Sequence, residues 1–192
     1  MEPEPKAAGA LRVLHISDLH VDAPLSTVPW RSWLSKRFVG GANYVLRRSR
    51  HFRAVRDKVR ALDRFRREAE VDLVLCTGDY TVLGTEAELR AARAAIEPLT
   101  AAPLGFVTVP GNHDVYVPEA SGRFERIFGD LLATDWPERC VDGRWPIVRL
   151  VGDTVAVVAV DSVRPNPHPW RASGRVPQAQ IDALAGVLAE LR

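Results

Sequence analysis

Three short apolar runs in the first two thirds of the chain each lead into polar residues that can bind a metal ion. Each run is too short for a helix and too apolar for a half-exposed strand, so we predict three buried β-strands. The runs and the polar residues that follow them are 11–16 with Asp18 and His20, 71–77 with Asp79, and 106–109 with Asn112, His113 and Asp114.

Apolar residues at three- and four-residue spacing predict helices over 51–69, 86–97, 118–132 and 177–191. Thr85 with Glu88 three residues later predicts a capping box at the start of the second helix. Strand and helix alternate twice, which predicts an α/β fold with right-handed crossovers and a largely parallel sheet. Two further apolar runs, 147–151 and 154–160, flank Gly152-Asp153 and predict a β-hairpin.

The length of 192 residues fits one domain. Residues 1–10 are acidic and rich in proline, and we expect a disordered lead-in before a domain that spans 11–192. The apolar residues between about 21 and 50 follow neither a helical nor a strand period, so we expect an insertion over the active face. This segment is either a small cap that shapes substrate access or a packed surface loop.

Charge is uneven along the chain, although the net charge is only +2. Between residues 31 and 67, Lys and Arg outnumber Asp and Glu by 13 to 2. A solvated helix face explains most of this excess, and a phosphate-rich partner is the alternative. Arg47, Arg48 and Arg50 lie near the expected cap and are the candidates for binding an anionic substrate.

The two cysteines, Cys76 and Cys140, predict unpaired thiols and a reducing compartment. The chain shows no signal peptide and no apolar segment long enough for a membrane span. We therefore expect a cytoplasmic protein.

Carboxylate, imidazole and amide oxygen together suit divalent ions such as Mn, Fe or Zn. The order DxH, GD and GNHD, each after an apolar run, resembles the calcineurin-like metallophosphoesterase family. The resemblance covers the motifs from Asp18 to Asp114 and, more loosely, Asp161-Ser162 to the end. It implies a metallophosphoesterase-type sandwich of β-sheets flanked by helices, with two divalent metal ions.

The resemblance also implies roles for individual residues. Asp18 and His20 would bind the first ion, Asp79 would bridge both ions, and Asn112 would bind the second. A metal-bound hydroxide would attack phosphorus, with His113 as proton donor to the leaving group or as a cation for the developing charge. Asp114 would orient the loop or an imidazole, or it would only cap the turn.

The chain departs from the family at its end. Family members usually add two metal-binding histidines, the later in a Gly-His-x-His sequence, and this chain has only His168 after His113. We therefore expect the C-terminal part of the second sheet to be missing, through truncation, a split gene product, a complementing second chain or loss of activity. Weak or partial metal binding is the expectation for this chain alone, and its unpaired sheet edge would invite association.

These observations favour metal-dependent hydrolysis of a phosphodiester or phosphomonoester. The basic cluster and the insertion favour an extended anionic substrate such as a nucleotide or a phospholipid head group. The alternative is a non-catalytic module of this fold that acts as a protein-interaction scaffold. Nucleic-acid binding ranks last, because the helical period assigns Phe52 and Phe65 to the core and leaves no aromatic residues for stacking.

Overall fold

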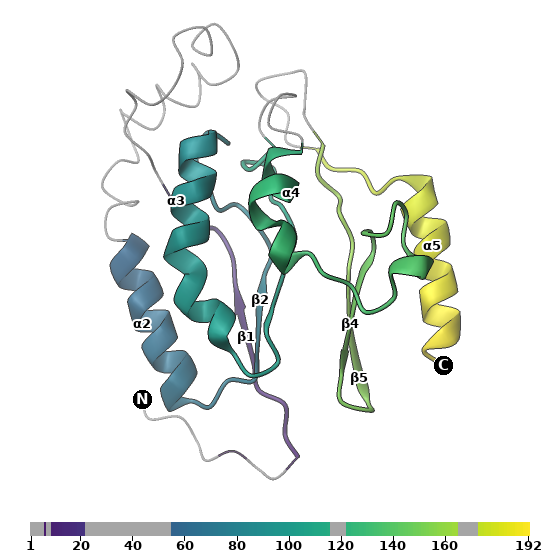
Figure 1. The fold of residues 1–192 in the computed structure, drawn as a ribbon, viewed down its shortest axis with the longest axis horizontal. Coiled ribbons are helices and arrows are strands. Elements are labelled where there is room, and N and C mark those ends of the chain that lie inside the picture. Colours follow the sequence, from purple (N-terminus) through teal and green to yellow (C-terminus); the bar gives the residue numbers. More distant parts are fainter. Residues whose placement is uncertain (1–5, 7–8, 22–54, 116–121, 165–172) are drawn as a thin grey trace, which may run out of the picture.

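The structure is a computed structural model that describes residues 6, 9–21, 55–115, 122–164 and 173–192 (Figure 1). Most of the expected lead-in and nearly all of the expected insertion lie outside the described residues. From the lead-in, Lys6 pairs with Asp72 at 2.6 Å between Nζ and Oδ1.

A parallel sheet of three strands lies at the centre of the described chain. The strands are β1 (Val13–Ile16), β2 (Leu73–Cys76) and β3 (Phe106–Thr108), in the order β1-β2-β3. The register pairs Val13 with Leu73 and Val74 with Phe106. The three predicted strands are confirmed, but the prediction that β1 is buried is wrong: Val13 is 43% exposed, because β1 is an edge strand of the described sheet. Because the strands are parallel, their carboxyl ends meet at one edge of the sheet.

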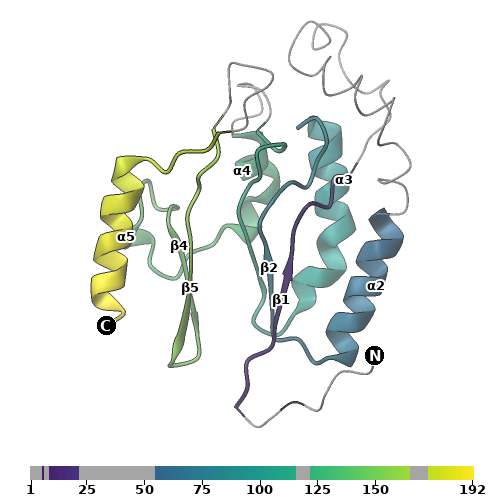
Figure 2. The ribbon, with the colours of Figure 1, turned by 180° about the vertical axis from the view of Figure 1, so that it is seen from behind.

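Helices cover one face of this sheet, as Figure 1 shows, while Figure 2 shows the strands from the opposite side. They are α2 (Val55–Glu68), α3 (Glu86–Ile96) and α4 (Arg123–Phe128), with a 3₁₀ turn, η4 (Glu97–Ala101), after α3. The predicted capping box is present: Thr85 Oγ1 accepts from the Glu88 N–H, and Glu88 accepts from the Thr85 N–H. The core between helices and sheet includes Val59, Val74, Leu89, Ile96, Phe106, Phe124 and Phe128.

Helix α2 buries Val55 and Val59 as the period predicts but departs from it at Phe65 and Arg66. Phe65, which the period assigns to the core, is 45% exposed, whereas Arg66 is buried. Arg66 lies inward because its guanidinium pairs with the buried Asp63 carboxylate at 2.9 Å and also reaches the Ala101 carbonyl. The assignment of Phe65 to the core is therefore wrong, and hydrogen bonding of the long basic side chain is the physical reason.

The predicted helix over 118–132 is shorter in the structure, although 118–121 lie outside the described residues. Helix α4 begins after Gly122, whose φ of 77° is left-handed, and at Gly129 it gives way to a 3₁₀ turn, η6 (Gly129–Leu131). The apolar pattern continues through η6, and for this reason the sequence reads as one helix.

The predicted hairpin forms a second, antiparallel sheet of β4 (Ile147–Val151) and β5 (Val155–Ala159). Val151 pairs with Val155, so the loop contains three residues. The last helix, α5 (Gln178–Glu190), lies beside this hairpin and contacts the 3₁₀ turn η7 (Pro137–Arg139) (Figure 2). Both cysteines are free, as predicted. No helix in the described part of the chain combines the length and apolarity of a membrane span.

Candidate functional site

The loops that follow β1 and β2 run side by side at the carboxyl edge of the parallel sheet. The N–H groups of Asp18, His20 and Val21 donate to the carbonyls of residues 78, 79 and 80 at 3.1, 3.0 and 2.6 Å. The parallel pairing of the strands thus continues into the loops. This backbone contact brings the DxH and GD motifs together although about sixty residues separate them.

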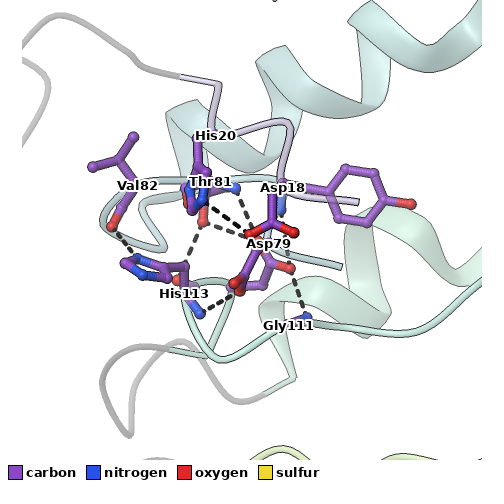
Figure 3. A network of polar contacts seen from close by, with 9 residues as sticks. Asp18, His20, Asp79, Thr81, Val82, Gly111 and His113 are labelled. Carbon is purple, nitrogen blue, oxygen red and sulfur yellow. Dashed lines mark hydrogen bonds and ion pairs between the residues drawn. The ribbon is translucent and has the colours of Figure 1, made fainter. Parts of the chain in front are cut away.

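Asp18, His20 and Asp79 direct their side chains to one point (Figure 3). One ligand atom from each residue lies within 4.8 Å of the other two, and this is the group of His, Cys, Asp and Glu side chains in the described residues that could hold a metal ion. His20 Nε2 lies 3.4 Å from Asp18 Oδ1. The Asp18 side chain is 62% exposed, so the group opens to solvent.

The backbone at these three positions is left-handed. The φ angles are 57° at Asp18, 48° at His20 and 56° at Asp79. For residues other than glycine this conformation is uncommon and costs of order 1 kcal/mol or more, so it persists where the surroundings impose it. Three such residues whose side chains converge on one point indicate a site rather than an ordinary turn.

The GNHD loop packs backbone to backbone against the GD loop. A Cβ atom built on Gly111 would lie 2.1 Å from the Asp79 nitrogen, and one on Gly78 would lie 2.2 Å from the Gly111 nitrogen. The His113 N–H donates to Asp79 Oδ1 at 2.9 Å. Asn112 lies on the turn between Gly111 and His113 and is exposed.

The two histidines of the site have defined orientations. Their ring centroids are 5.0 Å apart and the rings are perpendicular. His20 Nδ1 lies 3.1 Å from the Thr81 carbonyl oxygen, and His113 Nδ1 lies 2.8 Å from the Val82 carbonyl oxygen (Figure 3).

Asp114 is fully buried and points away from this opening into the loops. Its Oδ2 accepts from the N–H groups of Gly111 and Tyr80 at 2.8 and 3.3 Å, and its Oδ1 accepts from the Thr81 N–H and hydroxyl, both at 3.0 Å. Burial raises the pKa of Asp114 to about 6, although the Gly111 N–H favours the ionised form. The carboxyl therefore ties the loop after β3 to the loop after β2.

Some contributors to the site had no sequence signal. Thr81 and Val82 act through backbone carbonyls, which no side-chain motif reveals. Tyr80 is buried against Phe124 and Phe128, with ring centroids 5.8 and 4.7 Å away. His168 and Arg47, Arg48 and Arg50 lie outside the described residues.

Comparison with known families agrees with this arrangement. The family model for calcineurin-like phosphoesterases matches residues 11–180, well over half of the chain. The chain therefore belongs to the calcineurin-like phosphoesterase family, whose members are generally metal-dependent hydrolases of phosphoesters. The search among curated proteins found no match.

Proposed function

We propose that this protein hydrolyses a phosphoester with the help of two divalent ions, Mn, Fe or Zn. Asp18 and His20 would hold the first ion, Asp79 would be shared by both, and Asn112 would hold the second. As the sequence predicts, binding by this chain alone would be weak or partial. The observation that carries the proposal is the convergence of Asp18, His20 and Asp79, from two loops, to within 4.8 Å.

The donor atoms suit such ions. A backbone carbonyl only accepts hydrogen bonds, so the contact with Thr81 assigns the proton to His20 Nδ1 and leaves Nε2 as the ligand atom when the ring is neutral. Two ligands that each lie about 2.1 Å from an ion are about 3 to 3.5 Å apart. The distance of 3.4 Å between His20 Nε2 and Asp18 Oδ1 fits this range.

Asp79 is suited to the bridging position because a carboxylate has two oxygens. Oδ1 accepts the His113 N–H, which fixes the carboxylate plane without using all of its lone pairs. Asn112 follows Gly111, which packs against Asp79, and precedes His113, which donates to it. This placement supports Asn112 as a ligand on the same side of Asp79.

His113 is the candidate proton donor to the leaving group. Its ring lies 5.0 Å from that of His20, close enough to reach a phosphate bound at the metal ligands. Bound ions would supply an activated water and positive charge for the phosphate oxygens. The residues of the chain would then position the ester. A doubly protonated His113 would supply its Nε2 proton as the ester bond breaks, or would stabilise the developing charge as a cation.

The left-handed backbone at Asp18, His20 and Asp79 favours the hydrolase over the scaffold alternative. A protein-interaction scaffold has no physical use for backbone strain at three converging metal-ligand positions. A nucleotide or a phospholipid head group as substrate and a cytoplasmic location remain predictions from the sequence.

The test is hydrolysis of bis-para-nitrophenyl phosphate after chelation and reloading with Mn²⁺. We expect Mn-dependent turnover that falls by about 100-fold or more in Asp79→Asn, because losing a ligand costs at least as much as losing a group that orients one. The matched control is Asp57→Asn, which alters a carboxylate that is 72% exposed on α2 and paired with Arg60. Turnover that needs no metal, or that survives in Asp79→Asn, would contradict the proposal.

A further inference from the structure

We propose that Thr81 is a positioning residue. Hydrogen bonds to Asp114 hold Thr81 in place, and Thr81 in turn holds the backbone carbonyls of residues 81 and 82. These carbonyls determine which ring nitrogen of His20 and His113 carries the proton. The chemical use of this arrangement rests on the proposed function, whereas the arrangement itself can be measured without activity.

The carbonyls determine the tautomer of each imidazole. The Nδ1 atoms of His20 and His113 lie 3.1 and 2.8 Å from the carbonyl oxygens of Thr81 and Val82. Because a carbonyl oxygen cannot donate, Nδ1 must carry the hydrogen in both rings. Nε2 is then the atom with the lone pair in each neutral ring, and two adjacent residues control both histidines.

The position of this segment depends on the Asp114 carboxylate. Thr81 is fully buried, and both its N–H and its hydroxyl lie 3.0 Å from Asp114 Oδ1. Hydrogen bonds to a buried carboxylate are among the stronger ones in proteins. Tyr80 on one side of Thr81 donates to the same carboxylate, so the chain is held at two consecutive residues.

The hydroxyl of Thr81 explains why this residue type is needed. Its single hydrogen goes to Asp114 Oδ1, with the His113 carbonyl at 3.2 Å as the second acceptor in reach. Its lone pair accepts from the Gly84 N–H at 3.2 Å. A valine would keep the shape of the side chain and lose these contacts, whereas a serine would keep them.

The consequence for the site concerns ligand geometry. With Nδ1 held by a carbonyl, His20 presents Nε2 toward Asp18, at 3.4 Å from Oδ1. If the carbonyls moved, either ring could rotate or change tautomer, and the ligand atom would leave this position. Removing a hydrogen bond that orients a ligand histidine typically lowers metal affinity by about 10- to 100-fold.

The test is long-range ¹H–¹⁵N NMR of the histidine rings in metal-free protein at pH 8. We expect Nδ1–H signals for His20 and His113 in the wild type and in Thr81→Ser. In Thr81→Val we expect a mixture of tautomers at both rings, together with Mn²⁺ affinity lower by about 10- to 100-fold.

Thr77→Val is the matched control, because the Thr77 hydroxyl lies 3.0 Å from His15 Nε2 and is exposed. It should change the His15 signals and leave those of His20 and His113 as in the wild type. A ring of His20 or His113 that carries hydrogen on Nε2 and none on Nδ1 in the wild type, or unchanged spectra in folded Thr81→Val, would overturn the proposal. If Thr81→Val does not fold, Thr81→Ala takes its place, and unchanged spectra in that variant would overturn the proposal in the same way.

The two proposals can fail separately. Absence of hydrolysis with Nδ1–H signals as expected would reject the proposed function and keep the positioning role. Hydrolysis with a ring that carries hydrogen on Nε2 and none on Nδ1 would do the reverse.

Discussion

The hydroxyl pair of Tyr80 and Thr108 anchors the loop that carries Asp79, and the cost of removing each hydroxyl should differ. Both residues are fully buried, with 2.6 Å between Tyr80 Oη and Thr108 Oγ1. Thr108 Oγ1 also donates to the Cys76 carbonyl at 3.1 Å. With its one hydrogen at the Cys76 carbonyl, Thr108 accepts from the Tyr80 hydroxyl, which also has the Cys76 side chain as a hydrogen-bond partner.

Tyr80→Phe removes one hydrogen bond and leaves Thr108 bonded to Cys76, so we expect a loss of about 1 kcal/mol in the free energy of unfolding. Thr108→Val leaves the buried Tyr80 hydroxyl with the Cys76 sulfur, a weak acceptor, in place of an oxygen, so we expect about 2 kcal/mol. The double variant removes the stranded hydroxyl and should lose only about 1 to 2 kcal/mol, less than the sum of the single losses.

Urea unfolding followed by circular dichroism gives the free energy of unfolding of the wild type and the three variants, and thermal melts give their melting temperatures. The melting temperature should fall by roughly 2 to 4 °C in Tyr80→Phe and by roughly 4 to 8 °C in Thr108→Val. Equal losses in the two single variants, adding up to the loss in the double variant, would refute the assignment of donor and acceptor.

Two more predictions follow from the contacts. Gly111→Ala should abolish Mn²⁺ binding and destabilise the fold, because its Cβ would lie 2.1 Å from the Asp79 nitrogen. Gly129→Ala is the control: its Cβ meets nothing within 4 Å and its backbone is helical, so Mn²⁺ titrations should be unchanged and the melting temperature should stay the same or rise. The hydrogen bond from Arg93 is the largest cause that holds the pKa of Asp130 below its usual 3.8. This stabilisation is present above pH 3.8 and is lost as the pH falls further through the folded-state pKa. The melting temperature, measured from pH 6 to pH 2, should therefore fall less steeply below about pH 4 in Asp130→Asn than in the wild type.

Much of the fold could be predicted because its strands are short apolar runs that end at turn residues. A strand that is buried on both faces needs apolar residues at successive positions, and 71–77 and 106–109 show this directly. The antiparallel hairpin could be predicted equally well, from two apolar runs around Gly152-Asp153. What the pattern could not show is that Arg66 and not Phe65 lies inward on α2, because the period treats Arg66 as polar although it bonds to the buried Asp63.

The candidate site, like the fold, could be predicted only in part from the sequence. The convergence of Asp18, His20 and Asp79 could be predicted because these residues follow neighbouring strands of one parallel sheet, and their role as metal ligands stays a prediction. Thr81 and Val82 were missed because they contribute carbonyl groups, which every residue has. The interpretation of Asp114 left loop orientation and turn capping open. Its bonds to Gly111, Tyr80 and Thr81 make it a tether between two loops, a property of the tertiary arrangement that one motif cannot encode.

The most direct test of this account is anomalous diffraction from crystals of the protein grown with Mn²⁺. We predict a manganese peak about 2.0 to 2.3 Å from His20 Nε2 and from one carboxylate oxygen each of Asp18 and Asp79. No peak at these residues under saturating Mn²⁺, or an ion bound through His20 Nδ1, would contradict the proposed metal site.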